Sequence, residues 1–78
     1  MPTVLRVDGF DVVILLPLRE HGPAHVHVRK AGDEVVIVLS SLVVRKVEGM
    51  RSADVVTAVG IVANHRVELL AAWRKHHG

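Results

Sequence analysis

The clearest strand pattern in the chain is the stretch His25-Val26-His27-Val28-Arg29-Lys30. Successive side chains of a β-strand point to opposite faces of a sheet. The two valines therefore share one face, which suits a hydrophobic core. The two histidines and the arginine share the other face, and we expect that face to be the less buried one.

The segment before this stretch reads Glu20-His21-Gly22-Pro23-Ala24 and adds a carboxylate and a third imidazole. Pro23 fixes its own φ and biases Gly22 towards an extended or turn conformation. The segment is therefore predicted to be a loop that leads into the strand. Glu20 and His21 then become candidates to join the histidine face.

Runs rich in β-branched residues surround this strand, and turn-forming residues separate them. The predicted strands are residues 3–7, 10–16, 25–30, 34–39 and 42–47. Asp8-Gly9 is a strong signal for a two-residue hairpin turn. The next hairpin turns either at Ala31-Gly32, which sets Arg29 opposite Glu34, or at Gly32-Asp33, which slips the register by one. The sequence leaves both registers open.

From residue 53 onward the apolar spacing becomes helical. The predicted apolar stripe consists of Val55, Val59, Val62, Leu69 and Trp73. Arg66 interrupts this stripe, and we expect its side chain to reach solvent or a carboxylate such as Glu20 or Glu34. Ser52 has the hydroxyl of an N-cap, and Asn64 could cap a second helix after a kink.

The predicted fold class is therefore α+β. A small twisted antiparallel sheet of four to five strands packs on a C-terminal helix or kinked helix pair. A chain of 78 residues is expected to form a single domain over residues 1–78. Its sheet occupies about residues 1–48 and its helical part about residues 52–77.

The composition of the chain bears on whether it binds nucleic acid, is exported or enters a membrane. Ten Lys and Arg against eight Asp and Glu give a net charge of +2, which does not by itself indicate a nucleic-acid-binding protein. The chain has no cysteine and no leader-like start, so we expect a cytoplasmic location. Its longest apolar run, residues 12–18, is far too short to span a bilayer, so we expect no membrane partner.

Half of the residues are hydrophobic, which is a large share for so small a domain. The apolar residues from 12 to 16 do not alternate with polar ones, so both sheet faces should be covered there. One helix covers only one face. We therefore expect a homodimer, or a complex with a small partner protein, to cover the other.

Three stretches carry a resemblance to a known family: Met1-Pro2-Thr3-Val4-Leu5-Arg6, Glu20-His21-Gly22-Pro23-Ala24-His25-Val26-His27-Val28 and Glu68-Leu69-Leu70-Ala71-Ala72-Trp73. In this order they resemble the bacterial domain of unknown function 4160 family over nearly the whole chain. The resemblance implies an intracellular protein of a two-gene toxin–antitoxin module, encoded beside a small antitoxin-like protein. It identifies no catalytic residue.

Two positions depart from the pattern of that family. Ala24 stands where a second proline is usual, and Val26 stands where an aromatic residue or isoleucine is common. These departures make the loop less stiff, whereas His25 and His27 stay in place.

The histidine face has three interpretations. In the first, it acts on RNA without a metal: His25, His27 and Arg29 supply a base, an acid and a charge for phosphodiester cleavage, with Glu20 beside them. Because small toxins of this size often cleave RNA, the resemblance adds weight to this hypothesis. Further phosphate contacts would come from basic residues around one loop. These are Arg45, Lys46 and Arg51.

In the second interpretation, His25 and His27 ligate zinc or another divalent transition metal, and His21 or Glu20 completes the set. Otherwise no cofactor is expected. In the third, the histidines are structural or meet a partner protein, and the chain is a non-enzymatic interaction or regulatory module. The sequence favours a toxin-like protein that binds or cleaves RNA and leaves the other two open.

Overall fold

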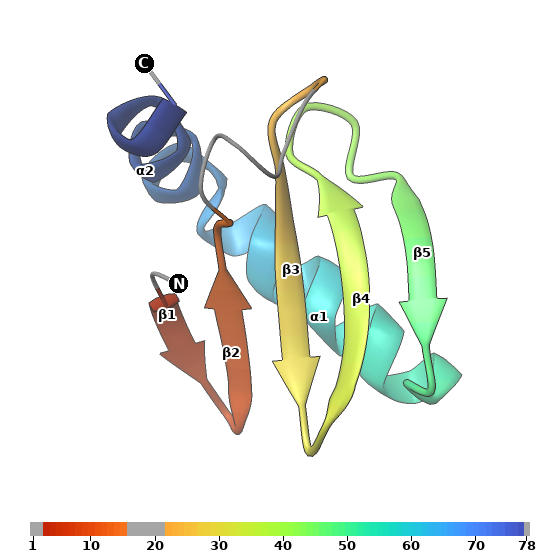
Figure 1. Cartoon of the computed structure of the whole chain (residues 1–78). Helices are drawn as coiled ribbons and strands as arrows, with labels where there is room; N and C mark the ends of the chain where they lie inside the picture. Colours follow the sequence, from red (N-terminus) through yellow and green to blue (C-terminus); the bar gives the residue numbers. More distant parts are fainter. Residues whose placement is uncertain (1–2, 16–21, 78) are drawn as a thin grey trace.

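The computed structural model describes residues 3–15 and 22–77, and it shows a five-stranded antiparallel sheet followed by two helices (Figure 1). The elements are Thr3–Val7 (β1), Phe10–Val13 (β2), His25–Lys30 (β3), Asp33–Val38 (β4), Val44–Glu48 (β5), Ser52–Asn64 (α1) and Arg66–His77 (α2). The order of the strands in the sheet follows their order in the chain. The predicted α+β class, with a kinked helix pair, is confirmed.

Two hairpin turns have backbone angles that few residues adopt. Asp8 and Gly9 have φ of +49° and +83°, and Ala31 and Gly32 have φ of +49° and +86°. Positive φ at both central residues is the type I′ turn that matches the twist of paired strands. The second turn therefore uses Ala31-Gly32, and of the two open registers the chain adopts the one with Arg29 opposite Glu34.

Five predicted strand bounds shift, including the ends of β4 at Val38 and of β5 at Glu48, each one residue from its predicted position. β2 ends at Val13, so Ile14 and Leu15 lie outside it, and Leu16 lies outside the described residues. β4 begins one residue earlier than expected, at Asp33. β5 begins at Val44 because Leu42 lies in a turn. Leu42 has φ of +61°, and its amide donates to the carbonyl of Val38.

The hydrophobic core lies between one face of the sheet and α1, which crosses behind it in Figure 1. Val26 and Val28 of β3 are fully buried in this core, opposite Ile37 and Val35 of β4. β2 is covered on both faces, because Val12 and Val13 point to opposite sides and both are buried. This agrees with the missing alternation in its sequence.

The helices differ from the predicted stripe in detail. Val62 and Leu69 are buried as expected, whereas Val55, Val59 and Trp73 are half-buried against the core. Two small or branched residues outside the predicted stripe, Ala58 and Ile61, are buried as well. A chain bent by 78° between α1 and α2 presents more than one stripe to the sheet.

The helix ends correct two predicted caps. Ser52 is the first helical residue, Arg51 holds the N-cap position, and no side chain caps α1. Asn64 is the last residue of α1, and His65, with φ of −115° and ψ of 18°, makes the break before α2. Nδ1 of His65 lies 3.4 Å from Oε1 of Glu68 in the first turn of α2.

Arg66 pairs with no carboxylate in the described part of the chain, and Glu20 lies outside that part. Its Nε donates to the carbonyl of Leu39 at 2.7 Å, and a terminal nitrogen donates to the carbonyl of Ser40. A planar guanidinium reaches two adjacent carbonyls at once, and the turn after β4 leaves these carbonyls unpaired by the sheet. The residue therefore ties the start of α2 to the end of β4.

Among the described residues, no single helix is both long and apolar enough to cross a membrane. The two helices reach that length and composition only when they are taken together across their bend.

Candidate functional site

Strand β3 places its polar side chains as its alternation predicts. His25, His27 and Arg29 lie on the face opposite Val26 and Val28, and the valines are the more buried set. The face is nevertheless far from solvated, because His25 is only 2% exposed and the side chain of His27 only 12%.

An apolar floor surrounds the two imidazoles. Val13 of β2 and Val36 of β4 pair with His27 on either side, and Val38 of β4 pairs with His25. These three valines are at most 7% exposed. Hydrogen bonds and charges therefore act here close to a low-dielectric surface, where water weakens them less.

Glu34 joins two side chains of β3. Its Oε1 accepts from Nε of Arg29 at 2.6 Å, and its Oε2 lies 3.2 Å from Nδ1 of His27. Arg29 is directly opposite Glu34, and His27 is the diagonal neighbour on the same face. The carboxylate is thus held at both oxygens.

The protonation of this group follows from its contacts. Burial raises the pKa of Glu34, but the hydrogen bonds from Arg29 and then His27 outweigh burial and lower it below 4.5. Glu34 is therefore ionised at neutral pH and can only accept. It follows that Nδ1 of His27 carries the hydrogen of this bond, so the neutral ring has its acceptor at Nε2.

His25 is oriented in the same way by a backbone group. Its Nδ1 lies 2.9 Å from the carbonyl oxygen of Pro23, which only accepts, so Nδ1 carries the hydrogen here too. Pro23 belongs to the loop that was predicted to lead into β3. Both rings are thus fixed in the tautomer whose acceptor is Nε2.

A row of rings continues from the histidines to the C-terminal helix. The centroids of His25 and His27 are 5.5 Å apart, and the ring of Trp73 lies 5.2 Å from that of His25. Trp73 stacks in turn on His77 at 3.7 Å, and Nε2 of His77 lies 3.0 Å from the carbonyl of Leu15. The last turn of α2 thereby packs against His25.

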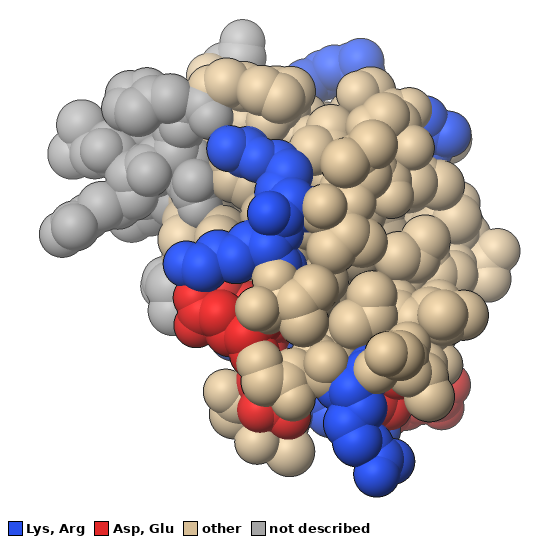
Figure 2. Space-filling view, turned by 90° about the vertical axis from the view of Figure 1, so that its right-hand side faces the viewer, with Lys and Arg blue, Asp and Glu red and all other residues tan. Residues whose placement is uncertain are grey.

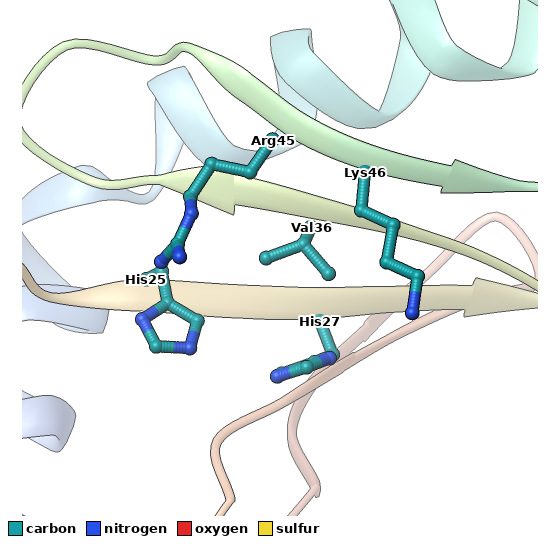
Figure 3. Close-up of a pocket in the computed structure, with 5 residues that line it drawn as sticks. All are labelled: His25, His27, Val36, Arg45 and Lys46. Atoms are coloured by element: carbon teal, nitrogen blue, oxygen red, sulfur yellow. The ribbon is translucent and has the colours of Figure 1, made fainter. Parts of the chain in front are cut away.

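An open pocket of about 280 Å³ lies on this face (Figure 3). Its lining residues are His25, His27, Val36, Arg45 and Lys46. The two cations come from β5 and reach over β4 towards the imidazoles.

The cations of β5 lie at the surface. Figure 2, which looks at the β5 side of the molecule, shows Lys and Arg side chains gathered in a blue patch with carboxylates below it. Nζ of Lys46 is 2.6 Å from Oε1 of Glu48, and this contact raises the pKa of Lys46. Lys46 is therefore charged at neutral pH.

The structure divides the predicted site residues into those that line the pocket and those that do not. His25, His27, Arg45 and Lys46 meet at the pocket, although they come from strands far apart in the sequence. Arg29 does not line the pocket, and it holds Glu34 instead.

The remaining predicted site residues are Arg51, Glu20 and His21. Arg51 is exposed at the start of α1 and does not line the pocket. Glu20 and His21 lie outside the described residues.

The described residues contain no group of three His, Asp or Glu side chains placed to hold a metal ion. His25 and His27 have the orientation that metal ligands need, because Nδ1 bonds a fixed acceptor. Two ligands are fewer than the three or four of protein zinc sites. A metal would therefore need His21 or another ligand from outside the described part.

Sequence reasoning missed two contributions to the site. It gave Glu34 opposite Arg29 as one of two open registers, but it did not extend the diagonal of that register to His27. It assigned Trp73 to the core alone, and no sequence signal indicated its contact with His25.

Comparison with known proteins shows what the chain is similar to. No curated protein and no solved structure matches it. The family model described as "Domain of unknown function (DUF4160)" matches residues 9–74, which are 66 of the 78 residues and include the whole pocket. The chain therefore belongs to the DUF4160 family.

Proposed function

We propose that this protein is the toxin-like component of a bacterial toxin–antitoxin pair, and that it binds and cleaves RNA in the cytoplasm. The observation that carries the proposal is the pocket, in which two oriented imidazoles meet two cations on an open surface. These are the groups that phosphodiester cleavage without a metal requires.

The reaction would use the 2′-hydroxyl of the RNA as its nucleophile. One imidazole takes the hydroxyl proton while the oxygen attacks the adjacent phosphorus. The other imidazole gives a proton to the departing 5′-oxygen, which leaves a 2′,3′-cyclic phosphate. His25 and His27 suit these roles because each imidazole is oriented by a hydrogen bond at Nδ1.

The other residues have supporting roles. Arg45 and Lys46 balance the negative charge that grows on the phosphate oxygens. Arg29, expected to be the charge beside the histidines, is a positioning residue here: it holds Glu34, and Glu34 orients His27.

A cleavage assay tests the proposal. The protein is incubated with a labelled single-stranded RNA and with the DNA of the same sequence, both with EDTA present. We expect cleavage of the RNA alone, with cyclic phosphate ends, and a fall of about 10²–10⁴-fold in rate for His25→Ala or His27→Ala. His76→Ala, on the last turn of α2 and outside the pocket lining, is the matched control and should keep the full rate.

Growth measurements separate a toxin from an interaction module. Expression of the chain alone should stop bacterial growth, and the double variant His25→Ala/His27→Ala should restore it. Intact RNA together with undisturbed growth would refute the proposal. Cleavage that EDTA abolishes would favour the metal-dependent interpretation instead.

A further inference from the structure

Strand β5 contains an irregularity at the pocket. Val36 of β4 pairs with Lys46, and the next residue, Ile37, pairs with Val44, so Arg45 is an extra residue without a partner in the ladder. This is the pattern of a β-bulge, which bends a strand and turns a side chain in a new direction. Bulges are common beside functional sites for this reason.

The bulge brings two adjacent side chains to the same place. In a regular strand, consecutive residues point to opposite faces, so only one of Arg45 and Lys46 would reach the histidine face. Both line the pocket here. Figure 3 shows Arg45 directed towards His25 and Lys46 directed towards His27.

The charges around the pocket favour an anion. Among the described residues, no carboxylate lines it. Two described carboxylates contact lining residues without lining the pocket themselves. Glu34 accepts from Arg29 and lies 3.2 Å from Nδ1 of His27, and Glu48 pairs with Lys46. The pair of Lys46 and Glu48 is exposed to solvent, so a bound anion can replace it without a large loss.

The position of β5 in the sheet favours a phosphate on a long chain. β5 is the outermost strand on its side of the described sheet, so no described strand closes the pocket beyond Arg45 and Lys46. A guanidinium bonds two phosphate oxygens side by side, and an ammonium supplies a second, compact charge. A polymer backbone could pass over this edge with one phosphate held in the pocket.

We infer that the β5 bulge builds a phosphate-binding site, with Arg45 and Lys46 as its two cationic contacts and His25 and His27 along its inner wall. The inference rests on the proposed function for its substrate, since it makes the scissile phosphodiester of RNA the bound group. Phosphate binding can nevertheless be measured without any cleavage, which separates the two proposals.

The experiment is an NMR titration with inorganic phosphate at constant ionic strength, read at the ring signals of His25 and His27. We expect saturable shifts with a Kd of roughly 1–10 mM. Arg45→Ala should weaken binding about tenfold. Arg51→Ala, an exposed arginine outside the pocket, is the matched control and should change it less than about twofold.

A composition-matched variant tests the bulge itself. Val47 pairs with Val35 and therefore shares the core side of the sheet. The double substitution Lys46→Val/Val47→Lys keeps the net charge and moves the ammonium to the other face. We expect it to weaken phosphate binding about as much as Arg45→Ala does, with unchanged amide spectra elsewhere as the check on folding.

The outcomes distinguish this site from the proposed function. Phosphate binding that both variants weaken supports the site, even if the protein cleaves no RNA. No ring shift at about 50 mM phosphate, or equal affinity in wild type and both variants, overturns it. RNA cleavage that persists at full rate in both variants also overturns it and leaves the proposed function standing.

Discussion

Glu34 is the residue on which the orientation of His27 depends. It is ionised, mostly buried and bonded at both oxygens, so its removal takes one acceptor from Nε of Arg29 and one from Nδ1 of His27. A group that stays unpaired in a partly buried place costs more than the bond itself contributed. We therefore expect a substitution of Glu34 to change both the stability of the protein and the chemistry of the histidine site.

We predict that Glu34→Gln lowers the free energy of unfolding by roughly 1–2 kcal/mol at pH 7. The folded-state pKa of Glu34 lies below its ordinary value of 4.5, so its contribution is complete above about pH 4.5 and is lost as the pH falls through the lowered pKa. Urea unfolding from pH 3 to 7 measures this. Wild type and variant should converge at the acid end, and a constant difference across the range would contradict the assignment.

The hairpin of β3 and β4 shows where the sequence determines an element and where it leaves a choice. The valine and histidine alternation predicts the strand and both of its faces. Two turn positions fit the sequence equally well, and the paired strands select Ala31-Gly32 although Ala31 must then adopt a φ of +49°. Local propensity alone therefore does not fix this register.

This strain leads to a prediction for the turn. Ala31 is exposed, and a left-handed conformation costs a non-glycine residue roughly 1–2 kcal/mol, less for asparagine. Ala31→Asn creates the preferred Asn-Gly pair of a type I′ turn and should stabilise the protein by about 0.5–1 kcal/mol. Thermal unfolding measures the gain, and Asn placed instead at the exposed Ala63 of α1 is a control that should give none.

The connection between α2 and β4 depends on one side chain. Arg66 donates to the carbonyls of Leu39 and Ser40, so Arg66→Ala should lower the free energy of unfolding by roughly 1–2 kcal/mol. Arg66→Lys keeps the charge but loses the two parallel N–H donors of the guanidinium, and it should recover less than half of the lost free energy. Denaturant unfolding of both variants measures these free energies. Full recovery with lysine would show that the charge alone matters.

Other features were beyond sequence reasoning for physical reasons. The bulge at Arg45 inserts a residue into the ladder without changing the pattern of polar and apolar residues. The turn at Leu42 and the contact of Trp73 with His25 depend on how the elements pack. By contrast, the histidine face of β3 followed from alternation, which needs no tertiary information.

The whole molecule covers more of its apolar surface than the sequence led us to expect. On the sheet face opposite α1, Val13, Val36 and Val38 are buried within the single chain. Among the residues that the structure describes, the large apolar ones that stay exposed are Val43, Val47, Val56 and Val67. A homodimer or a protein partner therefore stays a prediction, and its basis is now the open strand β5 with Val47 exposed on it.

We predict that the isolated protein forms dimers through pairing of edge strands. Light scattering across a concentration series should give a mass near twice 8.5 kDa at tens of micromolar. Val47→Lys adds a charge to the β5 edge and should shift the equilibrium towards the monomer, whereas Val67→Lys on α2 should not. A clean monomer at all concentrations would leave a small partner protein as the expected occupant.

The order of the strands also has a consequence for how the chain folds. Each strand pairs with the one made just before it, so the sheet forms through short loop closures, which favours rapid folding. The hairpins can therefore form while α2 is still being synthesised. The contact of Trp73 with His25 comes last, so the site acquires its final packing only when the rest of the protein is already in place.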